Sequence, residues 1–407
     1  MAHIEHTRQI ELCRELSVKD LFPNNQATGN FAVFCGDLHR RSLIASHAIK
    51  PYVGKVGIVF IHDDPFTSNT LGNLTRGVPG VNLFYANGNP GNARIYDPLY
   101  GLGENEISDI FFPDKNKKTE RARLSDYLSI MDYQFQKNPS VFGDYPYNLD
   151  LLLELTQMSV EQLQNTVLNY LPEDMKDRLY SRLSAENVQQ TVYDAVDDFC
   201  KLVQNSLWTP TSAARHSRIS IIAAAKKKDI ISLYIPNSDP SLLDYVYQEL
   251  AALIKSNIPF LLVESGLNFV EKSNFSELFF KEHSQLNYRT GILSQTVASV
   301  LNANNTNEMI RLASEYHEIV VMNCSSALEA EPYSTLAGIY FRQTVSSTKQ
   351  RFRNIFSLFP SLGSSSQTSE VQERNIRPEE IRDLNNGIML YGRSHQHPIL
   401  VDSFNID

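Results

Sequence analysis

NFAVFCGDLHRRSLIASHAI, residues 30–49, is the stretch that decides the expected fold. The apolar run at 31–34 predicts a buried strand, and residues 38–50 predict a helix after a tight turn. A strand, a turn and a helix in this order are the layout of a phosphate-binding loop, where backbone N–H groups at the helix start hold the anion. We therefore expect an α/β fold whose candidate site begins at this turn.

The phosphate-loop pattern G-x-x-x-x-G-K-[ST] is kept at its last position alone. Laid against it, Cys35 and Arg40 replace the two Gly residues, Arg41 replaces the Lys, and Ser42 is retained as a candidate Mg²⁺ ligand. Arg41 can grip a phosphate bidentately, although its planar guanidinium is larger than an ammonium. The other interpretation is that Arg40 and Arg41 are surface charges or pair with acidic neighbours. The candidate nucleotide contacts are Cys35, Gly36, Arg40, Arg41, Ser42 and Asp63.

Alternation of strands and helices continues on both sides of a helical block. Apolar runs predict further strands at 56–62, 230–235, 259–264, 289–294 and 319–323. Such alternation is typical of right-handed βαβ units and a mainly parallel sheet, which binds ligands at the carboxyl ends of its strands. Two strand-end residues therefore join the candidate site. Glu264 can hold a metal through water, and Gln295 is either a sensor of nucleotide state or a polar cap on its strand.

Three parts of the chain are distinguished by their texture. Residues 104–215 contain almost no Gly and show helical spacing of apolar residues, which predicts an all-helical insertion of four or five helices. Residues 1–29 predict a short helix and a polar connector, and the Ser-rich stretch 357–375 predicts a mobile loop. We expect one α/β domain from 30–103 and 216–407, interrupted by the all-helical domain 104–215.

Composition limits the classes of function. A length of 407 residues predicts two domains or one domain with a large insertion, and a net charge of −9 argues against a broad nucleic-acid-binding face. Four widely separated Cys residues fit reduced thiols and no zinc site, and no apolar run is long enough to cross a membrane. We expect a cytoplasmic chain. The basic clusters at 226–228 and 115–123 are either solvated helix ends or a path for a nucleic-acid backbone.

Several landmarks, in this order, resemble the type IV coupling proteins of bacterial conjugation, which belong to the FtsK/HerA-type group of RecA-like motor ATPases. The similar pieces follow the strand and helix at 31–49 and cover roughly 30–404. They are the strand ending at Asp63-Asp64, ARIYDPL before the helical block, PFLLVESG at the Walker B position, TGILSQTVASV around Gln295, and the closing IRPEEIRDLNNGIMLYG. The chain departs from the family in the altered phosphate loop and in Glu264-Ser265 where the family has Asp-Glu, and we expect no membrane anchor of the kind that many coupling proteins carry.

The resemblance implies a RecA-like P-loop NTPase fold with ATP and Mg²⁺ as cofactors, and with Glu264 and Gln295 at the catalytic positions. It also implies that 104–215 recognises the transferred protein or DNA. Because two catalytic stations are altered, we expect a degenerate ATPase domain that serves binding and assembly in a conjugative DNA-transfer or type IV secretion system. The alternative is an active ATP-dependent hexameric translocase of DNA or protein. The expected partners are the secretion or conjugation machinery and further copies of the chain, in the cytoplasm or held by partners at the inner membrane face.

Overall fold

The computed structural model describes residues 8–21, 31–62, 83–86, 95–183, 186–204, 218–235, 240–256, 258–265, 289–294, 318–322, 324–352, 361–392 and 397–406. The chain forms two compact units, which are described separately below. The first comprises 1–23, 28–44 and 294–407, and the second comprises 24–27 and 45–293. The domain boundaries predicted at 29/30, 103/104 and 215/216 stay predictions. None of the helices in the described residues is both long enough and apolar enough to cross a bilayer.

The first unit is built on five strands in the order β1-β14-β13-β10-β2. Strand β2 pairs in parallel with β10, and β10 pairs in antiparallel fashion with β13, so the sheet here is mixed. All five residues of β2 are buried, as the apolar run at its start predicted. The bounds of these strands are β1 (Glu11–Ser17), β2 (Phe31–Cys35), β10 (Glu318–Met322), β13 (Ile388–Gly392) and β14 (Ile399–Asn405).

Short helices accompany these strands. Helix α2 (Leu38–Ile49) begins directly after β2, and α16 (Ala327–Leu336) packs on the sheet, where the Tyr333 ring lies 5.5 Å from that of Phe34. The remaining helices are α1 (Val18–Leu21) and α17 (Pro378–Arg382). The helix predicted in the N-terminal segment is wrong over Glu11–Ser17, which form β1 paired in parallel with β14. Glu, Leu and Arg favour helix locally, but backbone pairing with a distant strand overrides that preference.

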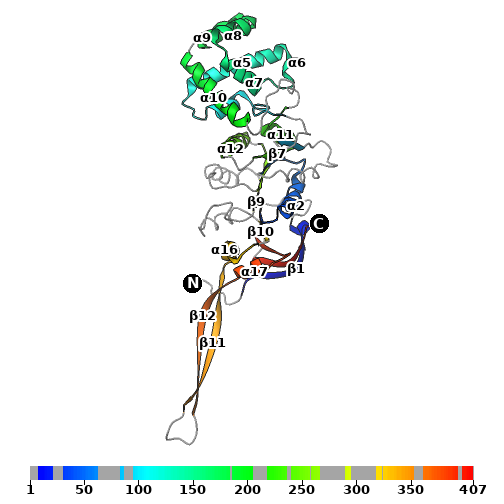
Figure 1. Cartoon of the computed structure of the whole chain (residues 1–407), viewed down its shortest axis with the longest axis vertical. Helices are drawn as coiled ribbons and strands as arrows, with labels where there is room; N and C mark the ends of the chain where they lie inside the picture. Colours follow the sequence, from blue (N-terminus) through cyan, green and yellow to red (C-terminus); the bar gives the residue numbers. More distant parts are fainter. Residues whose placement is uncertain are drawn as a thin grey trace. The chain divides into compact units, whose positions relative to one another are not determined.

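A long two-stranded ribbon also belongs to the first unit. Strand β11 (Ile339–Phe352) pairs with β12 (Ser361–Arg374) in antiparallel register, from Ile339 opposite Arg374 to Phe352 opposite Ser361. In Figure 1 the ribbon runs away from α16 and α17 as an arm. The mobile loop predicted for 357–375 is therefore wrong over 361–374. Ser and Gln carry little strand signal, yet every residue of β12 has a pairing partner in β11.

The second unit contains an all-parallel group of strands in the order β9-β8-β3-β7-β4. Every residue of β3 and β8 is buried, which explains their continuous apolar sequences. Helix α11 (Ile221–Lys227) lies so close to β3 that a Cβ added at Gly57 would be 2.4 Å from Ala225 Cα. The α/β class with a largely parallel sheet is thus confirmed. The strands are β3 (Gly57–His62), β4 (Leu83–Ala86), β7 (Ile230–Tyr234), β8 (Phe260–Ser265) and β9 (Arg289–Ser294), with α12 (Pro240–Lys255) between β7 and β8.

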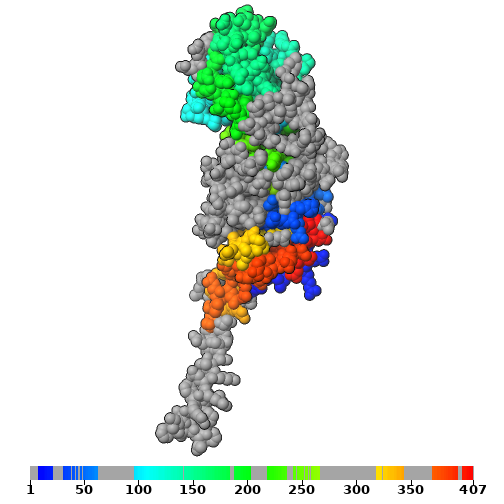
Figure 2. Space-filling view, viewed as in Figure 1, coloured from blue at the N-terminus to red at the C-terminus, as the bar shows by residue number. Residues whose placement is uncertain are grey.

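The described part of the predicted helical block, 104–183 and 186–204, is built of helices joined by short turns, and it is divided more finely than into the four or five helices expected. Its surface is drawn in cyan and green in Figure 2. Ser159 and Gln162 form a capping box at the start of α8, with Ser159 N donating to Gln162 Oε1 at 2.9 Å and Gln162 N donating to Ser159 Oγ at 3.2 Å. The elements are α4 (Glu104–Phe111), α5 (Lys118–Lys137), α6 (Pro139–Phe142), α7 (Leu149–Gln157), α8 (Val160–Thr166), a 3₁₀ turn (Leu168–Tyr170), α9 (Glu173–Leu183) and α10 (Glu186–Gln204).

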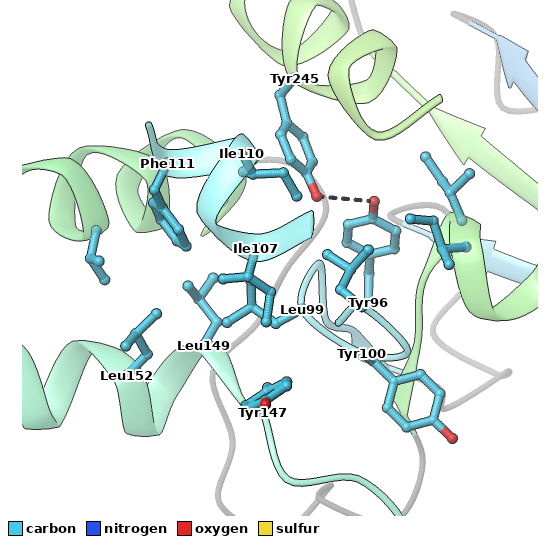
Figure 3. Packing of buried hydrophobic residues seen from close by; sticks show 14 of the residues in the cluster. Tyr96, Leu99, Tyr100, Ile107, Ile110, Phe111, Tyr147, Leu149, Leu152 and Tyr245 are labelled. Carbon is cyan, nitrogen blue, oxygen red and sulfur yellow. Dashed lines mark hydrogen bonds between the residues drawn. The ribbon is translucent and has the colours of Figure 1, made fainter. Parts of the chain in front are cut away.

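The helical block and the strands of the second unit share one apolar core. Its buried residues run without a break from Leu152 of α7 through Leu99 to Val59 of β3 and Leu262 of β8. Figure 3 shows the middle of this core, where helix and strand side chains interlock. The chain enters and leaves the block through β5 (Ile95–Tyr96) and β6 (Arg218–Ile219), which pair in parallel.

Candidate functional site

The link between β2 and α2 is short. Strand β2 ends at Cys35 and α2 starts at Leu38, so only Gly36 and Asp37 join them. In a phosphate loop the residues from the first Gly to the second surround the anion before the helix begins. Here the residues aligned with the last three of those positions, 38–40, already lie in the helix. The backbone therefore follows a strand–turn–helix path without a wide loop.

Asp37 caps the helix that follows this link. Its Oδ1 accepts a hydrogen bond from Arg40 N at 3.1 Å, the contact that defines an N-cap side chain. Arg41 N donates to the Asp37 carbonyl at 3.0 Å as the first regular helical bond. The two amides aligned with the second Gly and the Lys of a phosphate loop are thus used within the protein. A negative charge already occupies the end of the helix that attracts anions.

The two arginines of the motif behave differently from each other. Arg41 is buried, and its Nη1 lies 3.5 Å from the carbonyl oxygen of Cys35, so its guanidinium is turned back toward the strand end. Arg40 is half-buried and donates from Nη2 to Asn386 Oδ1 at 3.3 Å. Burial raises the pKa of the Cys35 thiol, which keeps it protonated. These contacts fit the interpretation that Arg40 and Arg41 make local structural bonds.

Glu264 lies in the second unit, at the end of β8. Its carboxylate is buried and accepts a hydrogen bond from the Tyr247 hydroxyl of α12. In register it is opposite Ile61 of β3 and Ile292 of β9, so it occupies the sheet face that carries α12. The next residue, Ser265, is also buried and is opposite His62. Glu264 is thereby oriented toward the helix layer of its own unit.

A small polar cluster lies on the other face of these strands. His62 at the end of β3 is fully buried, and its Nε2 is 2.8 Å from Ser232 Oγ of β7. The rings of Phe60 and Tyr234 flank the imidazole at centroid distances of 5.9 and 5.8 Å. These side chains satisfy one another within the sheet, which fits a structural role for the imidazole.

Some predicted site residues cannot be placed. Asp63 and Gln295 lie outside the described residues, and the same holds for the side chain of Ser42. Cys35, Gly36, Arg40 and Arg41 are neighbours in the first unit, whereas Glu264 belongs to the second. Across the residues that the structure describes, no group of three or more His, Cys, Asp or Glu side chains is arranged to hold a metal ion.

The root of the helical block is held by a buried ion pair. Arg218 of β6 donates to Asp97 Oδ2 at 2.9 Å, and both side chains are almost inaccessible to solvent. The same guanidinium donates to three carbonyl oxygens that precede α7, those of Phe142, Tyr145 and Tyr147, at 2.9, 2.8 and 2.6 Å. One side chain thus joins the entrance of the block, its exit and an internal loop.

A second buried group lies beside this root. Glu249 of α12 accepts hydrogen bonds from the Tyr96 hydroxyl and from the Tyr245 hydroxyl, the latter at 2.9 Å. Figure 3 shows the two phenols, whose oxygens lie 3.5 Å apart. The other oxygen of Glu249 accepts from Ile222 N at 3.4 Å, at the start of α11. Complete burial raises the pKa of Glu249 to about 7, although the two phenols partly oppose this effect. The carboxyl joins β5, α11 and α12.

The basic clusters make local contacts. Lys226 Nζ donates to the Gly101 carbonyl at 2.7 Å, and Lys227 Nζ lies 5.7 Å from the centre of the Tyr100 ring. In the second cluster, Arg121 donates to Asp109 and to the Phe112 carbonyl at the end of α4. These contacts favour the interpretation of the clusters as helix ends and surface charges.

Sequence reasoning missed three of the groups described above. Asp37 had a signal, because an Asp directly before a predicted helix is a standard N-cap. Tyr247 and Arg218 had none, because their partners are 17 and 121 residues away along the chain.

No protein-family model matches this sequence, and no curated protein matches it. The structure matches solved structures over most of its length. The bacterial conjugative coupling protein TrwBdeltaN70, in an unbound form, is 8% identical with a TM-score of 0.47, covering 96% of this chain and 91% of that one. The plasmid coupling protein TrwB, in complex with a non-hydrolysable GTP analogue, is 10% identical with a TM-score of 0.42 and coverages of 98% and 89%. VirB4 of Thermoanaerobacter pseudethanolicus is 13% identical with a TM-score of 0.36 and coverages of 82% and 89%. With TM-scores below 0.5, these likenesses carry no argument about activity.

Proposed function

We propose that this chain is a coupling-protein-like component of a conjugative or type IV secretion system, with a RecA-like core that no longer hydrolyses ATP and serves binding and assembly. The observation that carries the loss of hydrolysis is the two-residue link between β2 and α2. The ordered landmarks of the sequence motivate the family, and the helical block inserted between β5 and β6 supports the architecture.

The link disfavours nucleotide in three ways. A phosphate cradle needs a row of free backbone N–H groups, but the amides of Arg40 and Arg41 are paired with Asp37. The carboxylate of Asp37 would lie beside any phosphate bound at the helix start and repel it. The guanidinium of Arg41 bonds the strand end, so it would have to leave a buried position to contact a phosphate.

The second altered station supports the same conclusion. Phosphoryl transfer requires a carboxylate that holds the metal and a group that orients the attacking water. The buried carboxylate of Glu264 accepts a hydrogen bond from Tyr247, and Ser265 has no carboxylate to orient a water molecule. Two stations altered in one chain favour a protein that keeps the architecture of a motor without its chemistry.

The helical block is the proposed working surface. It shares a core with the strands of its unit and is joined to them by the Arg218–Asp97 pair, so it can present a fixed face to a partner. A transferred protein or DNA, or a component of the secretion machinery, would bind there.

Isothermal titration of ATP–Mg²⁺ into the full chain tests the loss of nucleotide chemistry. We expect no saturable heat at millimolar ATP and no phosphate release, with or without duplex DNA. Asp37→Gly is the informative variant, because it removes the repelling charge while Gly still tolerates the cap position. If the Asp37 carboxylate repels phosphate, this variant gains weak anion binding and still releases no phosphate.

The active-translocase alternative predicts the opposite results. Saturable ATP binding by the natural chain, with steady turnover that Arg41→Ala abolishes and the surface control Lys115→Ala preserves, would refute the proposal. Because Arg41 is buried, the circular dichroism spectrum and melting temperature of Arg41→Ala must match those of the natural chain before its activity is interpreted.

A further inference from the structure

The helical block carries nearly all of the net negative charge of the chain. Residues 104–204 contain 18 Asp and Glu against 10 Lys and Arg, which is a net charge of −8 in a chain of −9. Eight of those ten basic residues lie in 115–123 and 176–182, whereas 138–175 and 183–200 contain ten Asp and Glu and no Lys, Arg or His. These two acidic segments include α7, α8 and most of α10. Charge is therefore concentrated on one group of helices.

Helices α7 and α10 pack side by side and run in opposite directions. Near the start of α10, Gln189 donates from Nε2 to the Met158 carbonyl, which directly follows the end of α7, at 2.6 Å. At the other end of the pair, burial and then the nearby carboxylate of Asp150 raise the pKa of the Cys200 thiol. Midway between these two contacts, Glu154 of α7 comes level with Asp194 of α10. The two helices thus bring their acidic positions together.

The outer faces of these helices carry four carboxylates in two pairs, each pair separated by one helical turn. Three of the four side chains are exposed and that of Asp150 is half-buried. Within the part of the chain that the structure describes, no Lys or Arg forms an ion pair with the three exposed ones. We call this surface the α7–α10 face, and its carboxylates are Asp150, Glu154, Asp194 and Asp198.

The face is built to gain from a bound cation. Like charges four residues apart on a helix repel each other, so both pairs weaken their own helix until a positive group lies between them. The nearest basic side chain on α10, Lys201, is paired with Asp197 at 2.5 Å. Half-buried Leu151 and Leu153 flank the carboxylates of α7, where they can contact the apolar stems of long basic side chains.

We propose that the α7–α10 face binds an extended basic segment of a partner protein, with Lys or Arg at alternate positions. Alternate side chains of an extended segment are about 6.6 Å apart, close to the roughly 6 Å between helix positions one turn apart. Nucleic acid and anionic lipid have the same sign of charge as the face, which repels them. Among the described residues no acidic group is arranged to hold a metal ion, so a free metal ion is not the expected occupant.

This inference rests on the proposed use of the helical block as a binding surface. The proposed function leaves open whether a protein, DNA or a machinery component binds there, and the charge of the face selects a protein with a basic segment. Nothing in the inference depends on nucleotide, because the β2–α2 link lies in the first unit and α7 and α10 lie in the second.

Fluorescence anisotropy of the full chain with labelled (Arg-Ser)4 peptide tests the face. Labelled (Glu-Ser)4 peptide and labelled duplex DNA are the comparison probes, at 0.05 and 0.5 M salt. We expect (Arg-Ser)4 alone to bind, and more weakly at high salt because screening shortens the reach of exposed charges. An exposed ion pair changes affinity by up to about fivefold, so Glu154→Gln/Asp194→Asn should weaken binding about tenfold.

The matched control is Glu15→Gln/Glu370→Gln, which removes two exposed carboxylates from the first unit and should bind the peptide like the natural chain. Equal weakening in both double variants would mean attraction to net charge alone and overturns the proposal. Binding of duplex DNA with the same affinity as (Arg-Ser)4 also overturns it, as does displacement of the peptide by 1 mM Mg²⁺ at constant ionic strength. Self-association that Glu154→Gln/Asp194→Asn disrupts, without peptide binding, would make a second copy the occupant and overturns it too.

The two proposals fail separately. Absence of peptide binding in a chain that does not turn over ATP refutes the docking inference and leaves the proposed loss of hydrolysis in place. Steady ATP turnover in a chain that binds (Arg-Ser)4 through the α7–α10 face refutes the loss of hydrolysis and leaves the docking inference in place.

Discussion

Replacement of Arg218 by Met tests how the helical block is attached. Met fills a similar volume but cannot donate hydrogen bonds. In the natural chain the guanidinium donates to Asp97 and to the carbonyl oxygens of residues 142, 145 and 147, over distances of 2.6–2.9 Å. The variant leaves Asp97 as a buried carboxylate without its ion-pair partner.

The expected loss is large because the pair is inaccessible to water. Removing one partner of a buried ion pair costs about 3–5 kcal/mol, and buried carbonyl oxygens left without donors add about 1 kcal/mol or more. Domains are typically stable by about 5–15 kcal/mol, so Arg218→Met should bring the second unit close to unfolding. The loss should appear first in the helical block, which the guanidinium joins to β5 and β6.

Native-state hydrogen exchange measures this loss locally, and urea unfolding measures it globally. We expect the opening free energy of amides in α5 and α7 to fall by about 4 kcal/mol at pH 8. Burial raises the pKa of Asp97, and Arg218 opposes that rise. Without Arg218 the pKa of Asp97 in the folded state rises further above its value in the unfolded chain. The cost of burying the charged carboxylate is then present at a pH above the folded-state pKa, and it is relieved as the pH falls and Asp97 binds a proton. The deficit should therefore shrink between pH 8 and pH 5.

The double variant Arg218→Met/Asp97→Asn is the matched control. It removes the buried, unpaired charge of Asp97. The Asn side-chain oxygen can still accept the hydrogen bond that Leu99 N donates to Asp97 Oδ1 at 3.1 Å in the natural chain. The double variant should recover part of the loss and show no pH dependence from this site. A loss below about 1 kcal/mol for Arg218→Met, or a deficit that grows as the pH falls, would refute the reasoning.

Three further outcomes are expected. The folded-state pKa of Glu249 is raised to about 7, so the free energy of unfolding should decrease by about 3 kcal/mol as the pH rises from 4.5 to 7.5. Urea unfolding of Glu249→Gln should lack that decrease. The same dependence of unfolding free energy on pH in both proteins would contradict the prediction. Tyr247→Phe removes the donor to Glu264 and should cost about 1–3 kcal/mol in urea unfolding, whereas Tyr180→Phe at an exposed position of α9 should change little. Gly57→Ala places a Cβ 2.4 Å from Ala225 Cα and should cost about 3 kcal/mol, and an unchanged melting temperature would show that α11 yields without cost.

Much of the α/β core could be predicted from local pattern alone. The strands at 57–62, 230–234 and 260–265 are mostly apolar because they are buried on both faces of the sheet. The helical block was predicted by the spacing of its apolar residues and by the near absence of Gly, and its capping box follows from a Ser and a Gln three residues apart at 159 and 162. Burial and capping are local consequences of residue type.

The candidate site was less predictable, because its parts depend on partners far away in the sequence. A pattern search places Arg40 and Arg41 at phosphate-loop positions, but the length of the turn that precedes them is decided by where α2 begins, after Asp37. The position of Glu264 at a strand end indicates a metal ligand, but in the structure its carboxylate accepts a hydrogen bond from the Tyr247 hydroxyl. The partner that a polar side chain bonds depends on which groups the fold places beside it, and the local sequence does not specify those groups.

The sequence by itself determined the class of fold, the place of the helical block and the departure of residues 35–42 from the phosphate-loop pattern, because hydrophobic period and residue identity are local properties. Tertiary structure decided that Glu11–Ser17 and the Ser-rich 361–374 are strands, since backbone pairing with β14 and β11 stabilises segments whose side chains carry little preference of their own. It also decided that Arg218 and Asp97, 121 residues apart, form one buried pair. Charges so distant along the chain meet only when the whole core around them has closed.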